Sequence, residues 1–219
     1  GIYLNGGSLA LTDAIITGSV AQYGGGLWIN GTASLVRVAV LNNVALSGVA
    51  GGIDNEGQLS IDQSTISGNR ALQGTGGSPA PSGGGIFSEG TLTLTNSTLS
   101  DNRSDLIGGG IRNLQKMFLA NDTIWNNVAV QGGGIHNNGC LSLVNVTLNG
   151  NHANGNAGGA LYWDNSAIVC DPTVFATPAN LTIAGNSATT GGGIYAQTTL
   201  ALKNAILSGN LPANCGGFV

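Results

Sequence analysis

Three carboxylates are the side chains of this chain best suited to chemistry. Asp54 and Glu56 lie two positions apart, Glu89 follows 33 residues after Glu56, and Arg112 comes later. Carboxylates grouped on one face can cleave glycosidic bonds, whereas a lyase needs acids around calcium and a base that takes a proton. All three acids fall at expected turns, where polar residues are common. We therefore expect no catalytic residue, with a polysaccharide hydrolase or lyase as the less favoured alternative.

No other set of side chains has the spacing of a metal or cofactor site. His136 and His152 are closer than one repeat of the chain and belong to different corners of it. A zinc-ligand spacing, a phosphate-binding loop and a nucleophile–base pattern are all missing. The sequence thus predicts no cofactor and no metal. Trp28, expected to point outward beside an inward Leu27, is interpreted as an ordinary surface residue, with a ligand platform as the alternative.

These side chains are positioned by a repeat of about 25 residues, of which residues 83–102 are a clear copy. The repeat opens on a run of glycines, and the last glycine recurs with steps of 25, 26, 33, 25, 24, 26, 33 and 24 residues. Its positions are Gly1, Gly26, Gly52, Gly85, Gly110, Gly134, Ala160, Gly193 and Gly217. A fixed period of this length is typical of a solenoid.

Local patterns within the repeat favour strands over helices. Each glycine in a helix would cost about 1 kcal/mol, and every copy has several. Apolar residues alternate instead, as in Leu92-x-Leu94 and Leu200-x-Leu202, which is the period of a strand with one buried face. Leucine-rich and calcium-binding nonapeptide repeats need residue frames that are missing here. We predict an all-β protein: one single-stranded parallel β-helix (β-solenoid) domain over residues 1–219, with about eight coils of ~25 residues.

Two repeats are longer than the others. The first insertion, 73–82, is rich in Gly, Pro and Ser and is predicted to be an excursion loop. The second, 166–179, replaces a Leu-x-Leu strand and places Ala176 and Pro178 at the leucine positions. Solenoids tolerate insertions at corners because the stacking elsewhere is unchanged. A functional loop is the alternative for either insertion.

Two polar columns recur once per repeat. The first lies three residues after the apolar residue that ends each strand: Ser19, Asn43, Asn69, Asn102, Asn127, Asn151, Asn186 and Asn210. The second lies three residues before it: Asp13, Arg37, Gln63, Asn96, Asn121, Asn145, Asn180 and Asn204. Asn tolerates a left-handed backbone and bonds to neighbouring main chain, which suits corners. We predict structural hydrogen-bonded ladders, because a ligand site does not need the same residue in every coil.

Composition limits the partners and the location. Charged residues make up 7% of the 219 residues, and the net charge is −4. The absence of a basic patch argues against nucleic acid, and no run of 18 apolar residues predicts a membrane span. Without an initiator Met or a signal peptide, the chain is interpreted as a mature or excised piece. Three cysteines and abundant Asn, Thr and Ser favour an extracellular or cell-surface protein.

Two kinds of covalent modification are expected. Cys140 precedes a strand and Cys170 lies at the aligned corner one coil later, so we predict a Cys140–Cys170 disulfide, with Cys170–Cys215 as the alternative. Sequons occur at Asn30, Asn96, Asn102, Asn121, Asn145 and Asn180. Only Asn30 lies off both polar columns, in an expected turn, and it is the predicted glycosylation site.

The repeat resembles the motif pair of polymorphic outer-membrane proteins and related autotransporter-adhesin-like surface proteins. The first motif reads Gly84-Gly85-Ile86 and the second reads Leu99-Ser100-Asp101-Asn102, without the Phe usual in that family. The resemblance covers essentially the whole chain. It implies a secreted, right-handed β-helix with adhesive or structural roles, and it identifies no activity.

The expected function is structural, with subunits that stack end to end into a surface filament or fibre. The chain opens on Gly1-Ile2-Tyr3 and closes on Gly217-Phe218-Val219, which places Phe218 in phase with Ile2. Uncapped ends expose strand edges, and head-to-tail contacts between them build fibres. The predicted axial interface is Ile2, Leu4, Phe218 and Val219. The alternatives are a segment of a larger adhesin and a carbohydrate-binding β-helix that contacts cell-surface or extracellular-matrix glycans.

Overall fold

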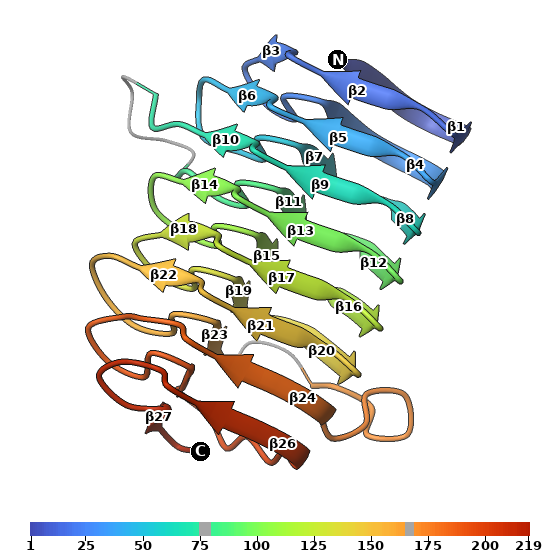
Figure 1. Ribbon diagram of the computed structural model, residues 1–219. Coiled ribbons are helices and arrows are strands. Elements are labelled where there is room, and N and C mark those ends of the chain that lie inside the picture. Colours follow the sequence, from blue (N-terminus) through green and yellow to red (C-terminus); the bar gives the residue numbers. More distant parts are fainter. Residues whose placement is uncertain (75–79, 165–168) are drawn as a thin grey trace.

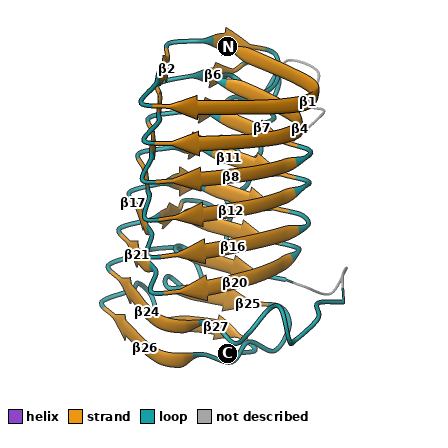
Figure 2. Cartoon of the chain, turned by 90° about the vertical axis from the view of Figure 1, so that its right-hand side faces the viewer, coloured by secondary structure: helices purple, strands orange, loops and turns teal. Residues whose placement is uncertain are grey.

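The computed structural model describes residues 1–74, 80–164 and 169–219 and is a β-solenoid of about eight turns (Figure 1). The paired strands run parallel, and no helix occurs in these three ranges. Successive turns stack along one axis, with the two termini at opposite ends of the stack (Figure 2). The predicted all-β parallel solenoid is confirmed. Parts of both predicted insertions, 75–79 and 165–168, lie outside the described residues.

A complete turn contains four strands, as in β11 (Ile86–Ser88), β12 (Thr91–Thr95), β13 (Thr98–Ser100) and β14 (Arg103–Ser104). We call the four stacks to which they belong the first, second, third and fourth faces. Each stack is continuous because the register repeats: Ile86 pairs with Ile53 of the preceding turn and with Ile111 of the following turn.

The other strands extend these faces. The first face contains β7 (Ile53–Asn55), β15 (Ile111–Asn113), β19 (Ile135–Asn137), β23 (Leu161–Trp163), β25 (Ile194–Ala196) and β27 (Cys215–Gly217). The second contains β8 (Gln58–Asp62), β16 (Lys116–Ala120) and β20 (Cys140–Val144), and β1 (Ile2–Thr12) and β4 (Leu27–Val36) run through both of these faces. The third contains β2 (Ile15–Thr17), β5 (Ala39–Leu41), β9 (Thr65–Ser67), β17 (Thr123–Trp125) and β21 (Thr147–Asn149), joined by β24 (Ala179–Ala184) and β26 (Lys203–Ser208). The fourth is a separate sheet of β3 (Val20–Ala21), β6 (Val44–Ala45), β10 (Arg70–Ala71), β14, β18 (Val128–Ala129) and β22 (His152–Ala153).

The interior is a stack of aliphatic layers. Each first-face strand turns its first residue inward, and these residues are fully buried in the middle turns: Leu27, Ile53, Ile86, Ile111, Ile135, Leu161 and Ile194. On the second face, Leu92 and Leu94 both point inward, as the alternating pattern predicts. The middle residue of each first-face strand therefore points outward, and this is the position from which the candidate site is built.

The glycine run before the first face permits a close passage of neighbouring turns. A Cβ on Gly84 would lie 2.4 Å from the carbonyl carbon of Arg103 and 2.4 Å from the carbonyl oxygen of Gly109. Both neighbours are backbone atoms, which cannot move aside without disturbing the stack. The recurrence of glycine in nearly every copy of the repeat follows from this contact.

Two sequence expectations about the last turns are wrong. Leu200 and Leu202 form no strand, and β26 begins only at Lys203, because the residues they would pair with in the preceding turn form no strand themselves. Cys215, and not Phe218, pairs with Ile194, so the last turn is shorter than predicted. Phe218 is consequently 67% exposed and is out of phase with Ile2.

Candidate ligand-binding groove

One outward position of the first face forms a row of aromatic and charged side chains along the solenoid axis. The row comprises Tyr3, Trp28, Asp54, Phe87, Arg112, His136, Tyr162 and Tyr195, each in register with the next. Paired strands lie about 4.8 Å apart, which brings these side chains into mutual contact. We call this set the ring row.

Aromatic rings stack at both ends of the ring row. The ring centroids of Tyr3 and Trp28 are 4.4 Å apart, with an interplanar angle of 10°. At the far end, Tyr162 stacks on His136 at 4.5 Å and on Tyr195 at 5.6 Å. Trp28 points outward beside the buried Leu27, as predicted, and it forms an aromatic pair with Tyr3.

A groove of about 310 Å³ opens in the N-terminal half of the ring row. It is lined by Tyr23, Trp28, Val49, Asp54, Glu56, Phe87 and Glu89. Tyr23 and Val49 come from the loops that precede the first face, whereas the exposed Glu56 and Glu89 come from the turns that follow it. The fold thus joins the three acids noted in the sequence to rings that sequence reasoning did not connect with them.

Asp54 is the most unusual group of the groove. Its side chain is only 4% exposed, and its Oδ1 atom is buried without a hydrogen-bond partner. Burial, together with the negative charges of Glu56 and Glu89, raises the pKa of Asp54 to about 7. A buried carboxyl without a partner is costly, and groups of this kind concentrate at functional sites.

The groups around Asp54 are held in place by specific contacts. Trp28 Nε1 donates a 3.1 Å hydrogen bond to Glu56 Oε1, and Asn30 Nδ2 lies 3.4 Å from Glu56 Oε2. On the other side, Arg112 follows Phe87 in the ring row, and its Nε is buried without a partner. Burial lowers the pKa of the Arg112 guanidinium, and the charge of Glu89 opposes this shift. The groove therefore contains fixed groups with unused hydrogen-bonding capacity.

The two histidines belong to different faces of the solenoid, His136 to β19 on the first face and His152 to β22 on the fourth. Burial, and then the charge of Arg112, lower the pKa of His136 to about 3, so its ring is neutral near pH 7. His136 Nε2 lies 3.2 Å from Gln131 Oε1. Within the described ranges, no group of three or more His, Cys, Asp or Glu side chains is placed to hold a metal ion.

The first polar column forms an interior ladder. From Asn43 to Asn210, each Nδ2 donates to the Oδ1 of the next asparagine at 2.8–3.0 Å. Each of these Oδ1 atoms also accepts the backbone N–H of the preceding asparagine. At the far end, Asn214 Oδ1 accepts from Asn210 Nδ2 at 2.8 Å, a termination that sequence reasoning missed. The amides are buried and fully used, so the ladder is structural, as predicted.

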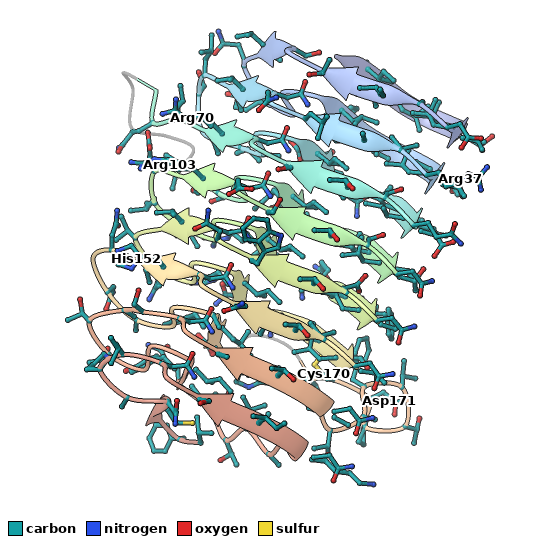
Figure 3. The ribbon with its side chains drawn as sticks, viewed as in Figure 1. Arg37, Arg70, Arg103, His152, Cys170 and Asp171 are labelled. Carbon is teal, nitrogen blue, oxygen red and sulfur yellow. A yellow bond between two sulfur atoms is a disulfide. The ribbon has the colours of Figure 1, made fainter. Side chains whose placement is uncertain are left out.

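The second polar column lies at the exposed corner between the second and third faces. Its residues all have left-handed backbones, with φ between 50° and 61° for the asparagines. Side-chain hydrogen bonds of 3.1–3.2 Å join Asn121 to Asn96, Asn145 to Asn121 and Asn204 to Asn180. Arg37 pairs with Asp13 at the start of this column, at the opposite edge of the ribbon from Arg70, Arg103 and His152 (Figure 3). Backbone geometry explains the column without a ligand.

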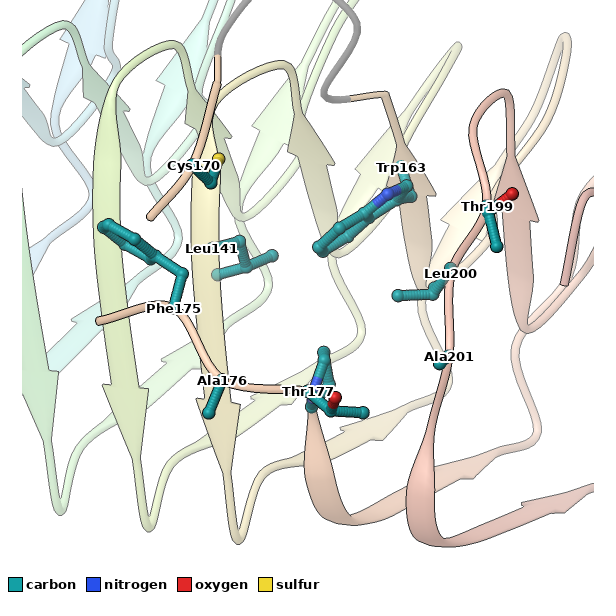
Figure 4. Close-up of a pocket in the computed structure, with 10 residues that line it drawn as sticks. Leu141, Trp163, Cys170, Phe175, Ala176, Thr177, Thr199, Leu200 and Ala201 are labelled. Atoms are coloured by element: carbon teal, nitrogen blue, oxygen red, sulfur yellow. The ribbon is translucent and has the colours of Figure 1, made fainter. Parts of the chain in front are cut away.

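A smaller pocket of about 160 Å³ lies beside the second insertion (Figure 4). Its lining includes Leu141, Trp163, Phe175 and Leu200. The insertion is fastened to β20 by a Cys140–Cys170 disulfide, with the Cα atoms 5.5 Å apart. Trp163 is in register with Asn137 of the preceding turn, and its larger side chain extends toward the space beside residues 169–178, which form no second-face strand. We interpret this pocket as a packing consequence of the insertion.

Glycosylation is expected at Asn30 and not at Asn102. Asn30 is exposed within β4, and not in a turn as predicted, whereas the Asn102 side chain is fully buried in the ladder. We expect glycopeptide mass spectrometry of protein secreted from eukaryotic cells to find a sugar on Asn30, and Asn30→Gln to remove it. A sugar on Asn102 with Asn30 unmodified would contradict the buried ladder.

In the described part of the chain, no helix has the length and hydropathy to cross a membrane. Comparisons with protein-family models, with curated proteins and with solved structures give no match to this chain.

Proposed function

We propose that this protein is a non-catalytic, extracellular β-solenoid that binds a glycan chain on its first face. The observation that supports this proposal is the ring row, with the groove set into it. Pyranose rings have apolar C–H faces that stack on aromatic rings, and hydroxyl groups that donate to carboxylates. Trp28 and Phe87 supply aromatic faces, and Asp54, Glu56 and Glu89 supply acceptors.

The direction and rigidity of the ring row also suit a chain-like ligand. The row follows the solenoid axis, so an extended glycan lying along it meets a new side chain at every turn, about every 4.8 Å. Its members stand on paired strands, and Asp54, Phe87 and Tyr162 are already buried. Binding therefore orders few side chains, which lowers its entropic cost.

Display outside the cell is the second part of the proposal. The Cys140–Cys170 disulfide favours an oxidising compartment. The resemblance of the repeat to surface β-helix families supports the same location and an adhesive role, for this chain alone or as a segment of a larger adhesin. Cell-surface or extracellular-matrix glycans are the partners that this location offers.

Replacing Trp28 tests the proposal. We expect Trp28→Ala to lower affinity for bound oligosaccharides roughly tenfold or more, because a stacking surface and the donor to Glu56 are both lost. Isothermal titration calorimetry against a panel of neutral and charged oligosaccharides measures this. Trp125→Ala is the matched control, since Trp125 is 42% exposed on the third face. Equal losses for the two variants, or no oligosaccharide bound by the wild type, would contradict glycan binding.

Head-to-tail association of copies is a second candidate. In the first and last described turns, interior side chains such as Leu4, Leu11 and Leu207 are only partly covered, and the strand edges are unpaired. Parallel pairing can continue across such edges from one copy to the next. The end of the asparagine ladder opposes pairing with a second copy. Asn214 Oδ1 already accepts from Asn210, at the position that the next asparagine of a continued ladder would occupy.

Sedimentation velocity over a range of concentrations tests association. We expect the wild type to form a series of elongated oligomers, and we expect smaller oligomers when the exposed Phe218 and Val219 are replaced by Ser. These substitutions leave the interior of the solenoid unchanged. A monomer at all concentrations would rule out head-to-tail stacking of this chain. It would leave the glycan proposal intact.

A further inference from the structure

The groove gathers more negative charge than the one nearby cation, Arg112, balances. Asp54, Glu56 and Glu89 line one space, and among the described residues the ion pairs join other groups, Arg37 to Asp13 and Arg103 to Asp105. Arg112 is the basic side chain nearest in the ring row, and Phe87 stands between it and Asp54. Arg112 attracts Glu89, so one cation is matched against three acids and the groove keeps an excess of negative charge.

The most buried of these acids also lacks a hydrogen-bond donor. Asp54 Oδ1 is inaccessible to solvent and unpartnered, although Asp54 lines the groove. The register places it between Trp28 and Phe87. A protonated primary amine has three donors and a full charge, and aromatic faces attract cations within about 6 Å of their centroids. A hydroxyl would supply a donor but not the charge.

We infer that the groove binds the protonated amino group of an amino sugar, with Asp54 as its acceptor and Trp28 and Phe87 on either side. This inference rests on the proposed glycan binding and names the class of sugar. Trp28 and Phe87 favour a saccharide over an isolated amine, because both line the groove and can pack against the C–H face of a sugar ring.

Binding of this ligand is coupled to the ionisation of Asp54. The titratable and charged groups that face Asp54 across the groove are Glu56 after β7, Glu89 after β11 and Tyr23 from the loop before β4, and Arg112 of β15 lies beyond Phe87. With a pKa of about 7, Asp54 is mostly neutral at pH 6 in the free protein. An ammonium group beside it lowers this pKa, so binding at pH 6 releases protons.

Calorimetry with three matched oligomers tests the inference. The probes are β-1,4-linked hexamers of glucosamine, N-acetylglucosamine and glucose at pH 6, each measured in two buffers of different ionisation enthalpy. We expect the glucosamine hexamer to bind roughly tenfold or more tightly than the neutral hexamers, with proton release. Asp54→Asn should remove both the preference and the proton release while neutral hexamers bind within about twofold of wild type.

Asp101→Asn is the control for general attraction between an acidic protein and a cationic ligand. Asp101 is exposed outside the groove, and its replacement changes the net charge by the same amount. This variant should keep the preference for glucosamine. Equal affinity for all three hexamers, or an unchanged preference in Asp54→Asn, would overturn the amine inference and leave glycan binding standing. Failure of wild type to bind any hexamer would overturn both.

Discussion

Replacing Asp54 by Asn is expected to raise the free energy of unfolding at pH 8 by about 4 kcal/mol and to change it little at pH 4. The pKa of Asp54 is raised from 3.8 in its unperturbed state to about 7 in the fold. Below pH 3.8 the carboxyl is protonated in both states, and its contribution to stability is fully present. That contribution is lost as the pH rises from 3.8 through 7, because over this range the unfolded chain ionises freely while the folded protein keeps the buried carboxyl protonated.

Urea unfolding of both proteins between pH 4 and pH 8 measures this difference. Asn has nearly the same shape as Asp and no charge. The difference in the free energy of unfolding between Asp54→Asn and wild type should therefore grow as the wild-type carboxyl ionises. Asp101→Asn, at an exposed position, should leave the pH dependence of the wild type unchanged. Parallel stability curves for wild type and Asp54→Asn would show that Asp54 is not strained by burial.

Replacing Asn127 by Ala is expected to lower the free energy of unfolding by about 3 kcal/mol. Asn127 Oδ1 accepts from Asn102 N and Nδ2, both at 3.0 Å, and its Nδ2 donates to the Leu99 carbonyl at 3.1 Å and to Asn151 Oδ1 at 3.0 Å. The side chain is fully buried. Alanine leaves these groups without partners where no solvent replaces them.

A second variant separates lost hydrogen bonds from lost volume. Asn127→Asp has nearly the same shape, but it turns an acceptor toward Asn151 Oδ1 and the Leu99 carbonyl, so it should destabilise at least as much as Ala at pH 7. Gln22→Ala, at an exposed position, should change the free energy of unfolding by less than about 0.5 kcal/mol. Similar small effects for all three variants, measured by urea unfolding, would contradict the ladder.

These two residues illustrate opposite uses of a buried polar group. Asn127 is buried with its hydrogen bonds satisfied by the turns above and below, so burial strengthens the stack. Asp54 is buried with one oxygen unsatisfied, so burial weakens the fold above pH 7. The buried amides of the ladder have hydrogen-bond partners, whereas the buried carboxyl of Asp54 in the groove lowers the stability of the fold. A destabilising buried group in a groove is the pattern expected of a binding site.

The solenoid and its ladders could be predicted from the periodicity of the sequence. Three features recur with the same period: alternating leucines, a glycine in nearly every copy and two asparagine columns. Each turn of the solenoid contains one such period, as from Gly85 to Gly110, so stacking the turns places equivalent residues above one another. Inward and outward positions follow from the period of two in a strand. For this reason the buried amides from Asn43 to Asn210 and the left-handed corner at Asn96 could be placed from residue types alone.

The location of the candidate site could not be predicted from the sequence and follows from the folded chain. The ring row contains six residue types at one structural position, with Tyr at Tyr3, Tyr162 and Tyr195 only, so no residue shared by all turns marks it in the sequence. The groove also depends on Tyr23 and Val49 from loops outside the strands, and the burial of Asp54 cannot be read from alternation, which predicts an exposed residue there. The last turn shows the same limit, because its length, and thus the choice of Cys215 over Phe218, depends on which residues reach Ile194. Periodicity predicts the residues that every turn has in common. A site formed by side chains and loops that differ between turns can be located only when the positions of the turns relative to one another are known.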